Sequence, residues 1–199
     1  MMITMALGNL LSFIRSVFAH VPWGHWLVIV TVSLALTVFL LIRKRHSAYG
    51  AICFGLAVFF GLFLLDTAVG IRWGDGTKHL TGFSLPAELH RIIHGGTVRW
   101  TEMFANMAVF LPFGFFLSEF LSTTKCFATR HQIGCVALAA FGLSLCIESL
   151  QLIFRLGVFE ITDLVLNTLG GFFGALMSAG RFRVKPGMRR GVGERRHWH

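Results

Sequence analysis

The sequence predicts an all-α fold, a polytopic transmembrane helix bundle of about five spans. Apolar residues make up 55% of the 199 residues and charged residues only 14%, whereas about a quarter of the residues in an average soluble domain are charged. The mean hydropathy is +0.70. Long stretches lack Lys, Arg, Asp and Glu, and roughly 18 or more such apolar residues in a row are typical of bilayer spans. This composition excludes a disordered chain and a water-soluble globule.

Five apolar runs are each long enough to cross about 30 Å of hydrocarbon as a helix that rises about 1.5 Å per residue. The tight turn from Leu156 to Ile161 makes the last two spans antiparallel neighbours. The bundle is therefore expected over residues 24–180. Its expected spans are Gly24 to Ile42, Ala48 to Ile71, Met103 to Ser122, Ile133 to Phe154 and Thr162 to Gly180.

Residues 1–23 precede the first span and are too mixed in polarity to cross a membrane. Their apolar residues recur at helical spacing, with polar residues on the other side, which predicts a helix lying in the membrane interface. A cleaved signal peptide is the alternative. The first fourteen residues carry no Lys or Arg, so they lack the charged start of such a peptide.

The basic residues predict the orientation of the chain. The net charge of +9 would suggest a nucleic-acid partner in a soluble protein, but here the basic residues lie in short loops and in a tail, residues 181–199. We therefore expect no nucleic-acid partner, and contacts with anionic lipids instead. Counted on alternate sides of the spans, Lys and Arg number 12 on the side of the tail and 6 on the other. The positive-inside rule then places the tail in the cytoplasm and the N-terminus outside.

The longest connection, from Arg72 to Glu102, is consequently expected outside the cytoplasm. Pro86 can open a short helix in it, and the pair Gly95-Gly96 can end that helix. We expect this loop helix to rest on the outer membrane surface.

Polar side chains of four spans share one depth, in the outer third of the bilayer. Such groups are costly in lipid and mark a site or a buried partner. The spacing of Glu148, Gln151 and Arg155 predicts that they share one face of span four. The candidate ligand-binding residues are Asn106, Glu148, Gln151, Arg155, Asp163 and Asn167, with Asp66 nearby.

Two interpretations of this cluster remain open. Glu148, Arg155 and Asp163 can form a closed ion network that fixes the register of the helices. Alternatively, the cluster lines a cavity open to the outer leaflet and holds the head group of a lipid or lipid-linked ligand. The second is favoured because the cluster has more hydrogen-bonding groups than one ion pair can satisfy. An arginine suits a phosphate or carboxylate, whereas two carboxylates suit a neutral or amino-sugar head group.

Four residues have a predicted structural role. Pro112 removes the hydrogen-bond partner of the Ala108 carbonyl, so a kink is expected in span three, either opening a cavity beside Asn106 or remaining inert. Gly114 follows in the same span. Gly170 and Gly174 have the small-residue spacing that lets another helix approach closely, and a homo-oligomer is left open.

Other candidates point to structure more than to chemistry. His90 and His94 have a two-ligand spacing but no buried third ligand, so no metal site is expected. No cofactor motif is found either. Glu119 near the cytoplasmic end of span three is expected to reach toward Lys125 or Arg130. The cysteines, which have no ligand spacing, are expected to be free packing residues: Cys53, Cys126, Cys135 and Cys146.

The region from about residue 99 to 180 resembles the VanZ-like family of bacterial membrane proteins. The resemblance is carried by Asn106 with Phe110-Leu-Pro-Phe-Gly114, by Glu148-x-x-Gln151-x-x-x-Arg155, and by Asp163-x-x-x-Asn167-x-x-Gly170-x-x-x-Gly174. It implies a multi-pass protein of the bacterial cytoplasmic membrane with an envelope function. The family's named member is associated with low-level teicoplanin resistance, so the resemblance implies a glycopeptide-related role without a defined reaction.

The leading hypothesis is a protein that binds a glycolipid, a lipid-linked precursor or a lipoglycopeptide in the outer leaflet, with membrane lipids as its other partners. One alternative is an enzyme in which Glu148 or Asp163 acts as general base. The sequence has no Asp-rich metal motif, no G-x-S-x-G and no phosphate-binding glycine loop. A structural scaffold is the second alternative. A transporter has little support because no internal repeat is found.

The topology can be tested with reporter fusions at Lys78 and at Gly187. The distribution of basic residues predicts an extracytoplasmic signal at Lys78 and a cytoplasmic signal at Gly187. A cytoplasmic signal at Lys78 would contradict both the orientation and the outer-leaflet site.

Overall fold

The computed structural model describes residues 21–43, 46–70, 90, 93–94, 96–124, 128–157 and 159–183. Within these residues all regular structure is helical, and five helices are long and apolar enough to cross a membrane. The predicted all-α bundle with five spans is confirmed. The elements are α2 (Trp23–Ile42), α3 (Ala48–Leu65), the π-helix η1 (Asp66–Gly70), α6 (Gly96–Thr124), α7 (Thr129–Ile153) and α8 (Ile161–Arg183).

Two predicted segments lie largely outside the described residues. The interfacial helix was expected over residues 1–23, of which the structure describes only Val21, Pro22 and Trp23. Of the expected loop helix after Pro86 it describes His90, Ile93 and His94, all helical. Both helices therefore stay predictions.

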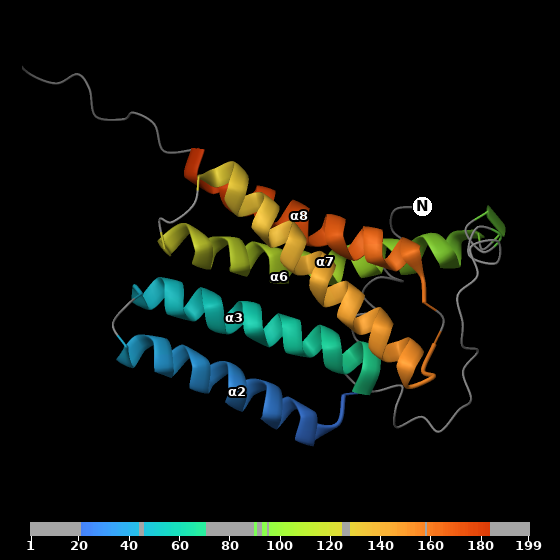
Figure 1. Ribbon diagram of the computed structural model, residues 1–199, viewed down its shortest axis with the longest axis horizontal. Coiled ribbons are helices and arrows are strands. Elements are labelled where there is room, and N and C mark those ends of the chain that lie inside the picture. Colours follow the sequence, from blue (N-terminus) through green and yellow to red (C-terminus); the bar gives the residue numbers. More distant parts are fainter. Residues whose placement is uncertain are drawn as a thin grey trace, which may run out of the picture.

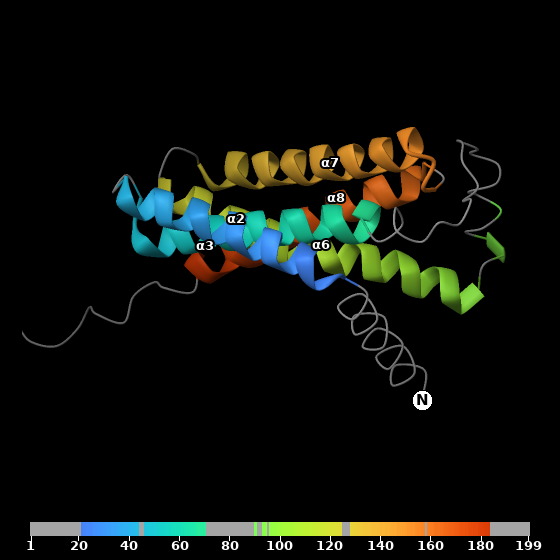
Figure 2. The ribbon, with the colours of Figure 1, turned by 90° about the horizontal axis from the view of Figure 1, so that it is seen from below.

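Local chemistry explains where several helices begin. Pro22 precedes the first residue of α2, a position where a missing N–H costs nothing. Ser47 caps α3, because its side chain accepts a hydrogen bond from the Gly50 N–H at 3.1 Å. α6 begins at Gly96, whose φ of +56° suits glycine. Its 29 residues span roughly 43 Å at about 1.5 Å per residue, so α6 projects beyond the other helices in Figure 2.

The helices lie lengthwise in one bundle (Figure 1), with α6 packed against α8, α3 and α7, while α2 packs mainly on α3. One end of the bundle holds the end of α3, η1, the end of α7 and the start of α8, and we call it the loop end. The opposite end, where α2, α6 and α8 finish, we call the tail end. α6 and α8 run in the same direction, and α7 runs antiparallel to both.

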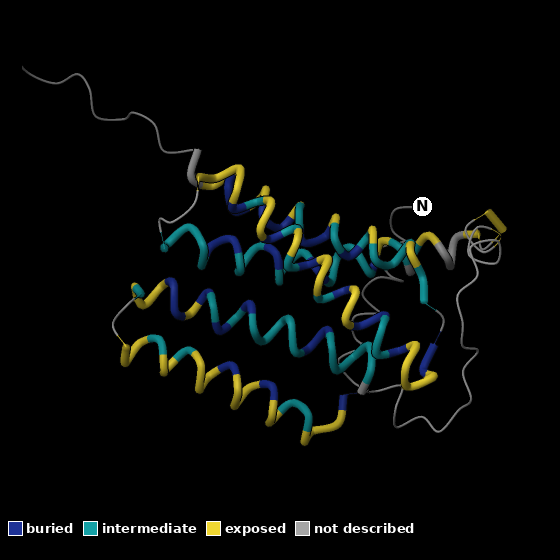
Figure 3. The backbone as a smooth tube through the Cα atoms, in the orientation of Figure 1, coloured by how far each residue is buried: buried dark blue, intermediate teal, exposed yellow. Residues whose placement is uncertain are grey.

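Burial follows this arrangement. In Figure 3 the exposed positions cover much of α2, whereas α3 and α6 are mostly buried or half-buried. Only 11% of the apolar window of α2 is buried, so most of its side chains are placed to face lipid. The interior is built from small residues such as Ala51, Ala140 and Ala175, which let the helices approach closely.

Four glycines bring α6 and α8 into direct backbone contact. A Cβ added at Gly114 would collide with the backbone of Gly171, and one at Gly174 would collide with the backbone of Leu111 and Phe115. A Cβ at Gly170 would meet the Met107 carbonyl. We call Gly114, Gly170, Gly171 and Gly174 the glycine seam. The helix that approaches Gly170 and Gly174 is therefore α6 of the same chain.

Pro112 lies in the middle of α6, beside this seam. The helix continues through it from Gly96 to Thr124, although its ring nitrogen cannot donate to the Ala108 carbonyl. Neighbouring helices can compensate for such a lost bond within a membrane.

The seam predicts that Gly174→Ala destabilises the protein by about 1–3 kcal/mol, the usual cost of forcing a methyl group into a filled space. Gly180→Ala on the same helix is the matched control, because no heavy atom lies within 4 Å of the added Cβ. The control should be neutral or stabilising by up to about 1 kcal/mol. Thermal unfolding in detergent compares the two, and equal unfolding temperatures would contradict the role of the seam.

Candidate functional site

Two buried side chains of α7 hold the connecting segments of the loop end. Gln151 Nε2 donates a hydrogen bond to the Ala68 carbonyl of η1 at 3.0 Å. Glu148 Oε2 accepts one from the backbone N–H of Glu160, just before α8, also at 3.0 Å. Both side chains are almost wholly inside the protein, with exposed fractions of 3% for Glu148 and 5% for Gln151. They therefore connect α7 to the segments on either side of it.

A polar contact one helical turn deeper joins α7 to α8. Asn167 Nδ2 donates to Ser144 Oγ at 2.9 Å, and both residues are buried. Asn167 Oδ1 is buried too, and it has no hydrogen-bond partner among the described residues. A polar atom left in this state costs free energy unless a partner is supplied.

The register of α7 and α8 places two carboxylates at the same level. Ser144 lies one turn before Glu148, and Asn167 lies one turn after Asp163 on the antiparallel helix. The contact between Ser144 and Asn167 therefore makes Glu148 and Asp163 level with one another. Asp163 is half-buried in the first turn of α8, where the helix dipole stabilises a negative charge.

Asp66 brings a further carboxylate to the loop end. It opens η1, and its Oδ1 lies 2.7 Å from Nδ1 of His25 on α2, while its Oδ2 is buried with no hydrogen-bond partner among the described residues. Asn106 of α6 is half-buried. Because its neighbour Met107 faces Gly170, Asn106 lies within about one turn of the level of Asn167. The structure thus brings five of the six predicted ligand-binding residues to one end of the bundle at similar depth.

Arg155 does not share that arrangement, so the prediction that it lies on one helical face with Glu148 and Gln151 is wrong. α7 ends at Ile153, and Arg155 has a φ of +56°. The Leu156 N–H bonds to the Gln151 carbonyl at 2.8 Å, the reversal that often ends a helix with a left-handed residue. The Arg155 side chain is exposed on this turn. Arg155 therefore does not supply the cation of a closed ion network with Glu148 and Asp163.

A second polar cluster, which the sequence interpretation missed, lies at the tail end. Tyr49 donates a hydrogen bond to Glu119 Oε2 at 2.5 Å, and an Arg181 nitrogen lies 3.8 Å from Glu119 Oε1. Glu119 is only 2% exposed. The expectation that it reaches toward Lys125 or Arg130 is therefore wrong: it points into the bundle and joins α3, α6 and α8. The presence of Tyr49 at the start of the antiparallel span before α6 could have indicated this contact.

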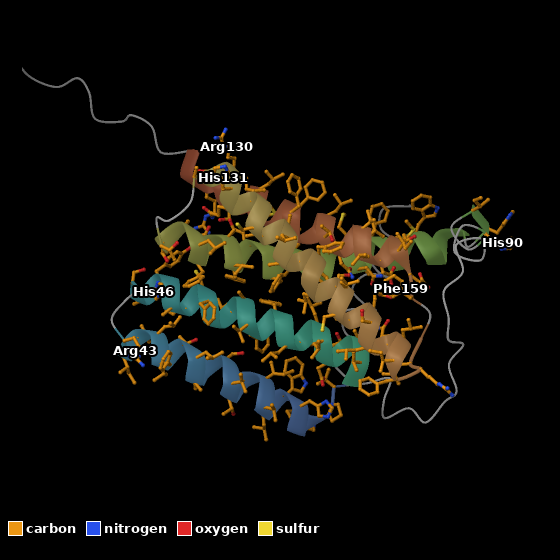
Figure 4. All side chains as sticks on the ribbon, viewed as in Figure 1. Arg43, His46, His90, Arg130, His131 and Phe159 are labelled. Atoms are coloured by element: carbon orange, nitrogen blue, oxygen red, sulfur yellow. The ribbon has the colours of Figure 1, made fainter. Side chains whose placement is uncertain are left out.

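The same end holds another link between α6 and α7. Gln132 Nε2 donates to the carbonyl and to the hydroxyl oxygen of Ser118, at 2.5 and 2.8 Å. Basic and imidazole side chains surround this end in Figure 4, where Arg43, His46, Arg130 and His131 lie at the tail end, and His90 and Phe159 lie at the loop end.

No three His, Cys, Asp or Glu side chains among the described residues are grouped to hold a metal ion. The rings of His90 and His94 have centroids 4.4 Å apart, and both residues are exposed. Cys53, Cys135 and Cys146 are free, whereas Cys126 lies outside the described residues. Buried amides and carboxylates, without a metal cluster in the described part of the chain, make up the candidate site.

These features define a multi-pass membrane protein with polar side chains buried at both ends of a helix bundle. The VanZ/LLP1 family pattern matches residues 65–182, more than half of the sequence. The chain belongs to the VanZ/LLP1 family. The match begins at the end of α3 and includes every residue of the candidate site.

A curated relative has the same family name. Protein VanZ of Enterococcus faecium is 38% identical over 80 residues, which make up 39% of this chain and 44% of that protein. The chain thus matches less than half the length of that relative. No solved structure matches it.

The turn after α7 predicts that Arg155→Gly does not lower stability, because glycine adopts a positive φ without steric cost. Arg155→Val removes the same guanidinium but introduces a β-branched residue, which this conformation disfavours. The valine variant should be less stable than the glycine variant by about 1–2 kcal/mol. Thermal unfolding in detergent measures both, and equal stability would contradict the left-handed turn.

Proposed function

We propose that the protein binds the polar head group of a cell-envelope amphiphile at the loop end of its bundle. Candidate ligands are a glycolipid, a lipid-linked precursor or a lipoglycopeptide. The proposal is supported by the gathering of Asp66, Asn106, Glu148, Asp163 and Asn167 at one depth in an otherwise apolar bundle. Ionisable and amide groups within membrane helices are expensive and mark functional sites by default.

The observation that carries the proposal is the buried Asn167 Oδ1, which has no hydrogen-bond partner among the described residues. Asp66 Oδ2, also at the loop end, is in the same state. Both atoms are acceptors. A head group with hydroxyl or N–H donors would satisfy them and recover the free energy lost when they leave water.

The orientation supports a site that faces the cell exterior. Arg43, Arg130 and Arg181 have exposed side chains. Arg43 and Arg130 lie at the tail end in Figure 4, and Arg181 lies in the last turn of α8, which finishes there. An excess of basic residues favours the cytoplasmic side. The loop end then lies in the outer leaflet of a bacterial cytoplasmic membrane, where lipid-linked precursors and lipoglycopeptides are encountered. Membership of the VanZ/LLP1 family, and the resemblance to a teicoplanin-resistance protein, support an envelope function of this kind.

One observation favours a structural scaffold as the second candidate. Glu148 and Gln151 bind backbone groups of Glu160 and Ala68, so part of the cluster also fixes the shape of the loop end. Under the scaffold hypothesis these contacts are the whole purpose of the cluster. Under the binding hypothesis they hold the walls of the site in place.

Glu148→Gln and Asp163→Asn separate these two functions. If the site binds a ligand, each single variant keeps its unfolding temperature within a few degrees but loses the teicoplanin-resistance phenotype in a susceptible host that expresses the protein. If the cluster is purely structural, each single variant would instead weaken a hydrogen bond to a charged group, at a cost of about 1.5–3 kcal/mol, and the phenotype would fall only with the amount of folded protein.

Glu119→Gln is the matched control, because it neutralises an equally buried carboxylate at the opposite end. It should retain the phenotype at equal protein level. A phenotype that falls only in proportion to the loss of folded protein would contradict the binding function. So would a loss of phenotype in Glu119→Gln that equals the loss in Asp163→Asn.

A further inference from the structure

We propose that the tail end of the bundle carries a binding surface for the phosphate head groups of anionic phospholipids. The surface is formed by basic and imidazole side chains that the candidate site at the loop end does not use, four of which are labelled at the tail end in Figure 4. This inference is independent of the proposed function, because it concerns the opposite end of the molecule. We call these side chains the basic rim: Arg43, His46, Arg130, His131 and Arg181.

The rim lies at the edge of the apolar belt, because two of its arginines lie over phenylalanine rings. Cζ of Arg43 lies 5.1 Å from the ring centroid of Phe39, and Cζ of Arg181 lies 5.6 Å from that of Phe115. Such cation–π contacts hold a cation beside apolar side chains. Phe39 is itself 50% exposed, so its pair with Arg43 faces the surroundings of the bundle. In a membrane, the boundary between apolar and charged side chains lies at the depth of the head groups.

α7 adds the positive end of a helix to the rim. The helix begins at Thr129, Ala128 supplies no side-chain cap, and the first turn holds no acidic residue. Arg130 and His131 lie in that turn, and both are exposed. The N-terminus of a helix favours an anion and disfavours nearby cations. A phosphate bound here would therefore stabilise the helix end and its two side chains together.

α6 brings the first turn of α7 and the last turn of α8 to the same level. Gln132 of α7 donates to Ser118 of α6, and Arg181 of α8 lies beside the next residue, Glu119. The side chain of Arg181 stays 63% exposed in this contact, whereas that of Glu119 is only 2% exposed. Most of the guanidinium surface is therefore available, and rim residues of both helices can contact one layer of head groups.

The sequence offers little negative charge to neutralise the rim. Among the described residues, Glu119 is the only carboxylate at the tail end. Residues 44–45, 125–127 and 184–199 adjoin the tail-end helix termini in the sequence. Together they contain eight Lys and Arg but one acidic side chain, Glu194. The excess of positive charge at this end does not depend on where those side chains lie.

A lipid fits this surface better than a nucleic acid does. Leu41 and Ile42 directly precede Arg43, and their side chains are 40% and 72% exposed. The acyl chains of a phospholipid cover such apolar surface while its phosphate contacts the arginine, which is favourable because the apolar surface leaves water. A nucleic acid supplies the phosphate but leaves the apolar side chains uncovered.

Native mass spectrometry of the 199-residue chain in a neutral detergent tests the charge preference. The probes are phosphatidylglycerol and phosphatidylcholine with identical acyl chains, of which only the first has a net negative charge. Phosphatidylglycerol should bind at least about fivefold more tightly, the factor that corresponds to about 1 kcal/mol for one basic residue near a membrane surface. Equal binding of the two lipids would overturn the proposal.

A double variant locates the preference without disturbing the buried cluster. Arg43→Gln/Arg130→Gln removes two charges of the rim and leaves Arg181 beside Glu119. It should lower the preference for phosphatidylglycerol by about threefold or more, whereas Arg43→Lys/Arg130→Lys keeps both charges and should retain most of it. Arg155→Gln removes an exposed arginine at the loop end and should have no effect. An equal loss of preference in Arg155→Gln and in the double glutamine variant would overturn the assignment to the tail end.

A second double variant separates the rim from the net charge of the chain. Arg189→Gln/Arg190→Gln removes the same number of charges outside the rim. It should lower the preference less than Arg43→Gln/Arg130→Gln does. Equal losses would mean that net charge alone attracts the lipid, and would overturn the assignment to the rim. The ranking of the two lipids by the unmodified protein does not depend on whether a variant folds.

Two further probes test the class of partner. Glycerol 3-phosphate carries a phosphate without acyl chains and should not displace phosphatidylglycerol at equal concentration. Displacement would overturn the assignment to a lipid. Any binding of duplex DNA to the protein in phosphatidylcholine nanodiscs should be the same for the unmodified protein and for Arg43→Gln/Arg130→Gln. A several-fold loss of DNA binding in that variant would overturn the proposal in favour of a nucleic acid.

Discussion

The backbone contact between α6 and α8 is the constraint on which the rest of the bundle depends. Helices in lipid gain little from hydrophobic burial against one another, so they associate through close van der Waals contact and polar links. The glycine seam supplies that contact along the middle of both helices. Because the two helices run in the same direction, the seam sets the relative depth of every polar side chain that they carry.

The buried carboxylates at the two ends of the bundle have different hydrogen-bond partners. At the tail end Glu119 has a tyrosine hydroxyl and an arginine beside it, both supplied by side chains. At the loop end Glu148 accepts a backbone N–H, and a carboxylate of the neighbouring helix lies at its level. Among the described contacts, an arginine side chain thus lies beside Glu119, whereas a backbone N–H binds Glu148. The reason for proposing ligand binding at the loop end is the buried Asn167 Oδ1, which has no hydrogen-bond partner among the described residues.

The sequence was sufficient to predict those features that depend on composition and residue spacing along each helix. Length and hydropathy predicted the five spans, and the spacing of Gly170 and Gly174 predicted a close helix contact, although the partner, α6, was not identified. The depth shared by Asn106, Glu148 and Asn167 also followed from counting residues along alternating spans. Each of these features follows from local composition or from spacing along the chain. None of them requires knowing which distant residues are in contact.

The features that the sequence did not reveal depend on where helices end and on contacts between residues far apart in the sequence. Whether Arg155 continues the face of α7 is decided by the turn after Phe154, which reverses the chain. The partner of Glu119 is Tyr49, which lies 70 residues earlier. The link between His25 and Asp66 spans 41 residues. The shift to a π-helix at Asp66 has no periodic pattern that would predict it.

The hydroxyl groups of α2 have a consequence for how the protein enters the membrane. Ser33 donates to the Ile29 carbonyl at 2.7 Å, and Thr37 donates to the Ser33 carbonyl at 2.8 Å. These bonds lie within α2, so both hydroxyls are satisfied before α3 leaves the ribosome. During biogenesis α2 can therefore pass from the translocon into lipid with the hydroxyls of Ser33 and Thr37 already hydrogen-bonded. Gly55 of α3 then packs against Thr37, and insertion and assembly become separate steps.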